Sequence, residues 1–225
     1  MKPIGYVVVA LVAAAAGFGI YQFGIAPRAN VAEPVASNEA ASADASEAAA
    51  GGESSDDALP ETLPDFTLAN LEGQPQSIRS WTGKSMIINF WATWCAPCRR
   101  EIPLLKKIQA EHGAEGFQIV GVAVDFRDDV LKYAKEIGID YPLLIGEEDG
   151  LDAVTKFGRG SLGFPFTVFT DNQQRLVLFH LGEIHPEQAD VMLAAVRKVN
   201  AGELTPAAAR AVAAKQLQEL PAAKE

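Results

Sequence analysis

The sequence predicts an α/β domain of three layers, with helices on both faces of a mixed central sheet, preceded by a transmembrane helix and a disordered linker. Between residues 59 and 202, apolar strand-like segments alternate with amphipathic helix-like segments, an order typical of α/β domains. The last two strand-like segments are separated only by a short polar turn at residues 171–174, so we expect them to pair antiparallel. Neither pattern occurs before residue 59.

Residues 1–26 are expected to form a membrane anchor. No charged residue lies between Lys2 and Arg28, and the segment is mostly Val, Ala, Ile, Phe and Gly. About 20 such residues cross a bilayer as a helix. A cleaved signal peptide is the alternative, but it usually has an apolar core of about 7–15 residues and a small-x-small cleavage site. Lys2 before the span favours a cytoplasmic N-terminus, which predicts a single-pass protein of the bacterial inner membrane whose folded domain faces the periplasm.

Residues 27–58 are expected to form a disordered linker. They are mostly Ala, Ser, Glu and Asp, with Arg28 as their one basic residue. Such a segment buries too little apolar surface to offset the entropy lost on ordering. As a flexible coil it would span on the order of 30 Å.

The folded domain is expected to occupy residues 59–202. Residues 64–78 indicate a short β-hairpin, and residues 85–92 a fully buried strand, because the latter are nearly all apolar and follow Gly83. A helix should then run to about His112, and a later one should begin at Asp128 as its cap and stop at Gly138. The remaining predicted strands are residues 116–126, 141–146, 165–170 and 174–181, and the remaining helices are residues 150–158 and 186–201.

Residues 203–225 read as a C-terminal helical tail. Thr205 can cap the helix, Pro206 suits its first turn, and Pro221 should end it. Its expected apolar face is thin, so we predict a dispensable surface element. That face comprises Val212, Leu217 and Leu220.

The overall charge argues against nucleic acid as a partner. The formal net charge is −10, with 29 Asp and Glu against 19 Lys and Arg. No stretch interleaves basic with aromatic residues, as a nucleic-acid-binding surface would.

Cys95 and Cys98, the only cysteines, are the candidate reactive groups. They follow a predicted buried strand directly and stand at the entry of a helix. Unpaired N–H groups and the helix dipole stabilise negative charge there, which favours a thiolate. Cys95 should benefit more and be more exposed, so it is the candidate nucleophile. Cys98, one turn into the helix, is close enough to form a disulfide with it.

Other uses of the two cysteines fit the sequence poorly. A structural zinc site needs four ligands, and only three scattered histidines accompany the cysteines. Covalent haem attachment requires a histidine directly after the second cysteine, where this chain has Arg99. A structural disulfide across so short a loop would constrain little. We therefore expect dithiol–disulfide exchange, with no metal and no cofactor beyond the redox-active disulfide.

The motif FWATWCAPCRREIP (residues 90–103), with GFPFT at residues 163–167, resembles the thioredoxin superfamily. More narrowly, the chain is similar to the membrane-anchored, extracytoplasmic thiol-disulfide oxidoreductases of the TlpA, ResA and CcmG type. The resemblance covers roughly residues 60–201 and implies a thioredoxin-like three-layer fold. Pro103 matches a helix-kinking proline of thioredoxins, while the anchor, linker and extra segment at residues 141–158 fit the TlpA-like branch.

The resemblance implies roles for four further residues. Pro165 corresponds to a cis-proline that faces the cysteines. Phe164 before it could pair its N–H and C=O groups with an extended substrate. Glu101 matches a glutamate that ResA and CcmG proteins use beside their thiols; one helical turn from Cys98, its carboxyl group could exchange a proton with that thiol. Trp94 should shield the sulfurs and shape a docking surface.

The chain departs from thioredoxin at two positions. Thioredoxin has a buried aspartate where this chain has Asn89, which cannot titrate, so Glu101 would take over its task. Phe164 is bulkier than the residue expected before the cis-proline, so substrate preference could differ.

Trp91 is expected in the core. Arg99 and Arg100 either line the mouth of the site or are solvated, and the histidines should be structural or exposed. The histidines are His112, His180 and His185.

The resemblance implies reduction of disulfide-containing proteins outside the cytoplasm. Cys95 would attack the substrate disulfide, and Cys98 would resolve the mixed disulfide with the help of Glu101. The redox potential sets the direction, and Ala-Pro between the cysteines is closer to reducing thioredoxins than to strong oxidants. The family draws electrons from a membrane donor protein and commonly serves cytochrome c or oxidase maturation.

Two other classes remain possible at this level. A thiol peroxidase shares the PDFTL sequence at the start of the domain and the fold, but the chain has no Pro-x-x-x-Thr-x-x-Cys sequence. A copper-handling module would also use two thiols, although the proline between them and the lack of adjacent Met or His argue against it.

Overall fold

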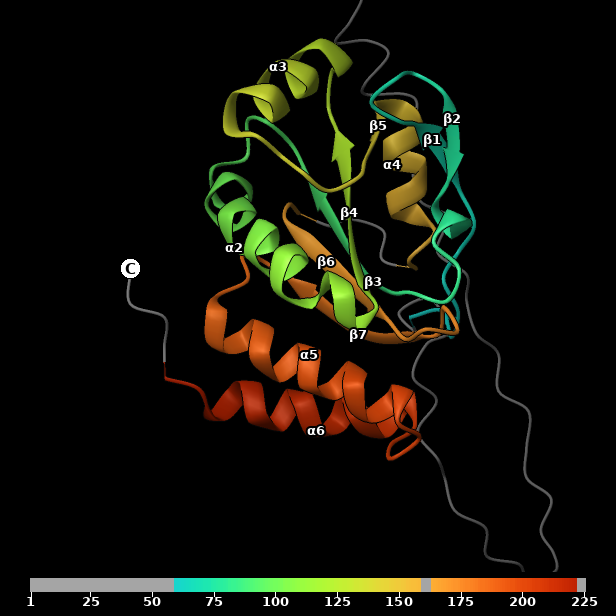
Figure 1. Ribbon diagram of the computed structural model, residues 1–225, viewed down its shortest axis with the longest axis vertical. Coiled ribbons are helices and arrows are strands. Elements are labelled where there is room, and N and C mark those ends of the chain that lie inside the picture. The colour runs from blue at the N-terminus through green and yellow to red at the C-terminus, as the bar shows by residue number, and fades with distance from the viewer. Residues whose placement is uncertain (1–58, 159–162, 222–225) are drawn as a thin grey trace, which may run out of the picture. The chain divides into compact units, whose positions relative to one another are not determined.

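A seven-stranded mixed sheet forms the centre of the folded domain (Figure 1). The computed structural model describes residues 59–158 and 163–221, so the expected anchor and linker lie outside the described residues. The strand order is β2-β1-β5-β4-β3-β6-β7. The strands are β1 (Thr67–Ala69), β2 (Pro75–Ser77), β3 (Ser85–Trp91), β4 (Phe117–Val124), β5 (Leu143–Gly146), β6 (Phe166–Thr170) and β7 (Leu176–Leu181).

The centre of the sheet is parallel and its flanks are antiparallel; the mixed sheet and its final antiparallel pair are as the sequence predicts. β3, β4 and β5 run parallel, with Asn89 opposite Gly121 and Gly121 opposite Leu143. β6 pairs antiparallel with β3 and β7 antiparallel with β6. The hairpin of β1 and β2 joins the other edge through β5. The carboxyl ends of β3 and β4 therefore lie side by side, directly before the cysteines.

Helices cover both faces of the sheet, because the side chains of a strand alternate between its faces. Ile87 and Trp91 of β3 belong to the core under α2, α3 and α5, whereas Ile88 and Phe90 belong to the core on the opposite face, which α4 covers. The helices are α2 (Ala96–His112), α3 (Arg127–Ile137), α4 (Glu148–Thr155), α5 (Pro186–Asn200) and α6 (Pro206–Glu219). Within the described residues, none is long and apolar enough to cross a membrane.

The expected cap of the third helix is wrong. α3 begins at Arg127 with Phe126 in the cap position, so Asp128 already lies inside the first turn. An acidic side chain there still interacts favourably with the helix dipole. Gly138 ends the helix with a φ of 61°, as expected, because glycine adopts this left-handed conformation without a steric penalty.

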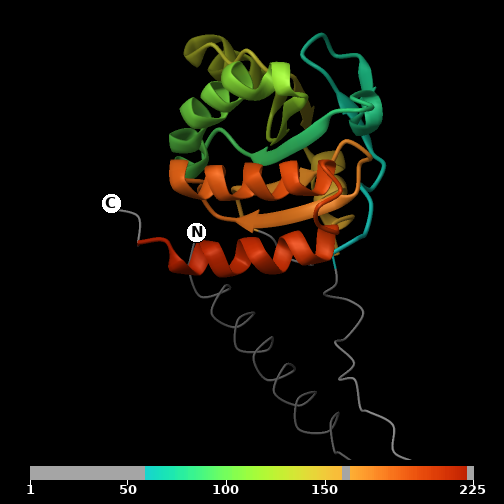
Figure 2. The same cartoon turned by 60° about the horizontal axis from the view of Figure 1, so that its bottom comes forward.

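α6 begins as the sequence predicts, but its buried face differs from the expected one. The Thr205 hydroxyl accepts a hydrogen bond from the N–H of Ala208, and the helix packs alongside α5 and against β7 (Figures 1 and 2). Ala209 and Ala213 are fully buried, whereas Val212 is exposed. Of the expected face, Leu217 is partly buried and packs against the core. The small alanines let the two helices approach closely, so the sequence pattern of large apolar residues identified only part of the interface.

Arg210 of α6 contacts the edge strand of the sheet. Its guanidinium group donates hydrogen bonds to the carbonyl oxygens of Leu176, at 3.0 Å, and Val177, at 3.3 Å. β7 has no strand on its outer side within the described sheet, and an open strand edge invites pairing with other chains. α6 thus covers this edge, which argues against its being a dispensable surface element.

Candidate active site around Cys95 and Cys98

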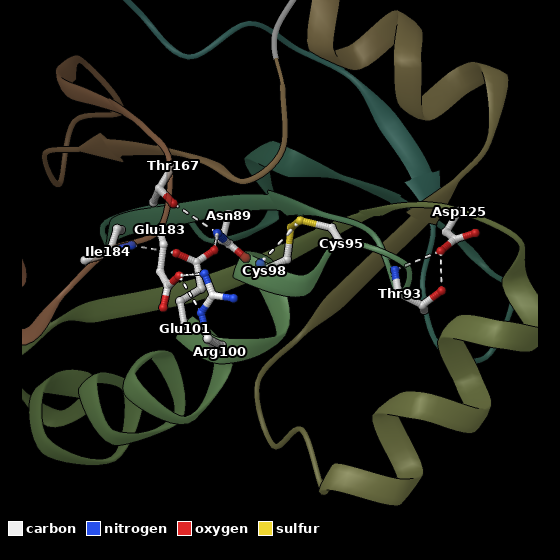
Figure 3. The surroundings of a disulfide bond; sticks show 10 residues. All are labelled: Asn89, Thr93, Cys95, Cys98, Arg100, Glu101, Asp125, Thr167, Glu183 and Ile184. Atoms are coloured by element: carbon white, nitrogen blue, oxygen red, sulfur yellow. Dashed lines mark hydrogen bonds and ion pairs between the residues drawn. A yellow bond between two sulfur atoms is a disulfide. The ribbon is translucent and has the colours of Figure 1, made fainter. Parts of the chain in front are cut away.

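Cys95 and Cys98 form a disulfide at the start of α2, with an S–S distance of 1.96 Å (Figure 3). Cys95 is the N-cap residue of the helix, and its Sγ accepts a hydrogen bond of 3.3 Å from the N–H of Cys98. The arrangement follows from the order of elements, since β3 ends at Trp91 and the chain turns directly into α2. The helix dipole and this N–H group favour negative charge on the Cys95 sulfur once the disulfide is reduced.

The two sulfurs differ in accessibility. Cys95 is 5% exposed, and Cys98, in the first turn of α2, is fully buried. Cys95 is therefore the more accessible of the two sulfurs, as the sequence analysis expected.

Glu101 is buried on the sheet-facing side of α2, with only 1% of its surface exposed. Its Oε1 accepts a hydrogen bond from the Asn89 side-chain amide at 2.8 Å, and its Oε2 accepts one from the N–H of Ile184 at 3.0 Å. Burial raises the pKa of Glu101 to about 7, against the lowering effect of both hydrogen bonds, and nearby Glu183 raises it further. A carboxyl group with such a pKa can accept and donate protons near neutral pH.

Asn89 lies between Glu101 and the disulfide in Figure 3. Its Nδ2 also donates to the Thr167 hydroxyl at 3.0 Å. Its buried Oδ1 has no hydrogen-bond partner among the described residues. An unpaired buried acceptor of this kind lowers the stability of the fold by about 1–3 kcal/mol. A hydrogen-bond donor placed beside this oxygen would recover part of that energy.

Two more buried polar groups lie on the same side of the sheet. Within the described part of the chain, Trp91 Nε1 and the Tyr141 hydroxyl also have no hydrogen-bond partner. Both rings pack around Gly121, where an added Cβ would lie 3.2 Å from each. Burial raises the pKa of Tyr141 well above its usual value, and Glu101 contributes to the rise. Trp91 is in the core, as expected.

The loop before β6 contacts Trp94, the residue directly before Cys95. The Phe164–Pro165 peptide bond is cis, as the resemblance implied. The rings of Trp94 and Phe164 lie 6.1 Å apart, and Trp94 is 70% exposed. The structure thus brings together Trp94, Phe164 and Pro165, three residues that the sequence analysis assigned to substrate binding.

Asp125 is a residue that the sequence analysis did not single out. Its Oδ2 accepts hydrogen bonds from the Thr93 N–H at 2.8 Å and from the Thr93 hydroxyl at 2.5 Å, while its Oδ1 accepts one from the N–H of Phe126. Asp125 directly follows β4, and Thr93 follows the neighbouring β3 closely. Side chains at the carboxyl ends of adjacent parallel strands meet at one edge of the sheet. The positions of Thr93 and Asp125 at the ends of two predicted strands were therefore a sequence feature that could have identified this contact.

The two arginines after Cys98 have separate contacts. The Arg99 guanidinium lies over the Tyr133 ring at 5.2 Å. Arg100 forms an ion pair with Glu183, with a hydrogen bond of 2.9 Å. Arg100 thereby connects the first turn of α2 to the loop that carries Ile184.

The three histidines have structural contacts, as expected. His112 contacts Glu115, and the N–H of His185 bonds to Gln188 at the start of α5. His180 is partly buried, and burial lowers its pKa. In residues 59–158 and 163–221, no group of three His, Cys, Asp or Glu side chains is placed to hold a metal ion.

The match to a family model decides the classification. Residues 60–178 match the model of the AhpC/TSA family. The chain belongs to the AhpC/TSA family. Its similarity to curated proteins includes the thiol-disulfide oxidoreductase ResA of Geobacillus thermodenitrificans, with 30% identity over 54% of this chain and 69% of that protein. The thioredoxin-like protein YneN of Bacillus subtilis is 30% identical over 58% of this chain and 75% of its own length.

Solved structures with similar folds include two thiol-disulfide proteins. A thioredoxin-family thiol:disulfide interchange protein from Chlorobium tepidum has a TM-score of 0.53 and 31% identity, covering 64% of this chain and 98% of its own. A secreted thiol-disulfide isomerase from Corynebacterium glutamicum has a TM-score of 0.55 and 28% identity, covering 60% and 85%. With the Cys95–Cys98 pair, these relatives identify the chain as a thiol-disulfide oxidoreductase with a thioredoxin-like fold.

Proposed function

We propose that this oxidoreductase reduces disulfides in extracytoplasmic proteins. The observation that supports this most is the pairing of a reachable Cys95 at the start of α2 with a buried Cys98. In the reduced protein, the Cys95 thiolate attacks a substrate disulfide, forms a mixed disulfide and releases one substrate thiolate. The Cys98 thiolate then attacks the Cys95 sulfur, restores the Cys95–Cys98 disulfide and releases the second substrate thiolate. Two electrons pass to the substrate in each cycle, and a dithiol donor in the membrane would replace them.

Glu101 would serve as the proton acceptor for Cys98. Cys98 is fully buried, and desolvation together with a neighbouring negative charge disfavours its thiolate. A carboxylate whose pKa is about 7 can accept that proton at neutral pH and lose it again between cycles. Cys95, Cys98 and Glu101 are thus the catalytic residues of the proposed reaction.

Trp94, Phe164 and Pro165 would hold the substrate beside Cys95. Phe164 stands before the first paired residue of β6, Phe166, so its backbone can pair with an extended chain in the manner of an edge strand. Trp94 presents an exposed ring next to Phe164, against which substrate side chains could pack.

A trapping experiment tests the proposed function. A Cys98→Ser variant keeps the attacking sulfur but cannot resolve the mixed disulfide. Expressed as the full chain, it should accumulate mixed disulfides with protein partners, visible as reductant-sensitive bands on gels and identifiable by mass spectrometry. A Cys95→Ser variant is the matched control and should trap none. Equal trapping by both variants would contradict the assignment of the nucleophile.

The proposed location is the periplasmic side of the inner membrane, with residues 1–26 as the anchor. It is supported by the charge-free apolar segment after Lys2. A phosphatase fused after residue 60 should be active in the periplasm. Activity only of a cytoplasmic reporter at the same position would refute the topology.

A further inference from the structure

A pocket of about 290 Å³ lies beside the candidate active site. It is formed by the ends of β4 and β5, the start of α4 and the loops that carry Trp94 and Phe164. Among the described residues, six large apolar side chains are exposed, and three of them line this pocket. They are Trp94 (70% exposed), Phe126 (64%) and Leu151 (52%). Single exposed apolar residues are ordinary, but a cluster of them marks an interaction site.

The walls of the pocket are held in place by the fold. The hydrogen bonds from Thr93 to Asp125 fix the turn that carries Trp94, and the bond from the Phe126 N–H to Asp125 fixes the opposite wall. α4 packs closely on β4 at Gly150, where an added Cβ would meet the Val124 methyl groups at 3.4 Å. Leu151, the next residue of α4, therefore has a defined place in the wall.

The charged residues of the pocket are all acidic. Asp125, Glu147 and Glu148 line it, and neither Lys nor Arg does within the described residues. The Asp125 carboxylate already accepts hydrogen bonds from Thr93 and from the N–H of Phe126. Glu147 and Glu148 are exposed. Two negative charges thus stand at the rim of an apolar pocket.

We propose that this pocket selects partner segments in which the reactive cystine is flanked by a bulky apolar residue and by a lysine or arginine. The apolar side chain would fill the space between Trp94, Phe126 and Leu151, and the cation would face Glu147 and Glu148. A volume of about 290 Å³ accommodates one large aliphatic or aromatic side chain. The inference rests on the proposed function, because the pocket can select only what Cys95 then reduces.

The position of the pocket supports this occupant. Trp94 precedes Cys95 directly, and the Trp94 ring contacts Phe164, so the pocket adjoins the point where a substrate would pair with the loop at Pro165. In an extended segment, residues two apart point to the same side. A residue two positions from the half-cystine can therefore reach the pocket while the sulfur faces Cys95.

Disulfide-bridged peptides that differ in two positions test the proposal. The full-length protein in detergent is reduced with dithiothreitol, freed of reductant and mixed with peptides that carry Phe and Lys, Phe and Glu, or Ala and Lys at the two positions that lie two residues from the half-cystine. Peptide thiol formation is followed by rapid acid quench and mass spectrometry. The Phe/Lys peptide should react about three- to tenfold faster than the Phe/Glu peptide, as expected for two exposed charge pairs, and the ratio should shrink at high salt.

Two variants separate the charged and apolar parts of the pocket. The double variant Glu147→Gln/Glu148→Gln should lose the preference for Lys over Glu. Leu151→Ser should instead reduce the preference for Phe over Ala. The matched control is Glu203→Gln/Glu219→Gln, which changes the net charge equally at exposed positions near the two ends of α6 and should keep both preferences.

The outcomes distinguish this proposal from the proposed function. Equal rates for the Lys and Glu peptides, or a preference that survives in the Glu147→Gln/Glu148→Gln variant, would overturn the selection by the pocket and leave disulfide reduction intact. If the reduced protein reacts with no disulfide at all, including insulin, the proposed function fails and the pocket proposal fails with it.

Discussion

Replacing Glu101 by glutamine should remove a specific pH dependence from the stability of the oxidised protein. Glutamine has nearly the same shape but does not titrate. In the native protein, the Asn89 Nδ2 faces the carboxylate while Asn89 Oδ1 has no partner among the described residues. In the Glu101→Gln variant, the new side-chain amide can donate a hydrogen bond to that oxygen after rotation of the Asn89 side chain, so we expect the variant to fold.

The size of the effect follows from the shift in pKa. Burial raises the pKa of Glu101 from 4.5 to about 7, so the folded protein holds this proton more tightly than the unfolded chain. The stabilisation is fully present below about pH 4.5, declines as the pH rises and is lost above about pH 7. One pKa unit corresponds to about 1.4 kcal/mol, so the decline amounts to about 3 kcal/mol.

Urea unfolding of both proteins between pH 4 and pH 8.5 measures this decline. The disulfide form is used, because neither cysteine titrates in it. The difference in the free energy of unfolding, wild type minus Glu101→Gln, should fall by about 3 kcal/mol across that range. Glu111→Gln is the matched control, since Glu111 is an exposed glutamate of the same helix. A difference that stays flat with pH would refute the raised pKa, and with it the reason for choosing Glu101 as the proton acceptor.

Three further predictions concern the sulfurs, the edge strand and the turn before the nucleophile. Cys95→Ser should abolish insulin reduction, whereas Cys98→Ser should still release one thiol per protein in a single-turnover assay; equal loss of this first step in both would contradict their assigned order. Arg210→Ala should lower the free energy of unfolding by about 1–2 kcal/mol and promote self-association in light scattering, because it uncovers carbonyl groups of β7. Asp125→Ala should cost about 1–3 kcal/mol and slow exchange with protein substrates, since Thr93 loses its partner; an unchanged rate would show that this turn needs no support from Asp125.

Much of the fold could be predicted from local patterns. The buried strand before Cys95, the helix to His112 and the stop at Gly138 depend on short-range apolar periodicity and on the conformational freedom of glycine. The cap at Asp128 was wrong because the start of the helix, at Arg127, is decided by how the chain leaves β4. The expected face of α6 was only partly right: Leu217 packs against the core, but Ala209 and Ala213 carry too little apolar surface to stand out in a sequence.

The sequence by itself determined the chemistry of the site, because the order strand, Cys95, Ala, Pro, Cys98, helix places two sulfurs at a helix N-terminus through local geometry alone. Only the tertiary structure decided the environment of those sulfurs. The raised pKa of Glu101 depends on burial of its carboxyl group between α2 and the sheet, against the opposing effect of the Ile184 N–H, which comes from a segment far along the chain. The acidic pocket likewise depends on α4 packing against β4. Desolvation and pocket shape arise from contacts between distant segments, and no local pattern records them.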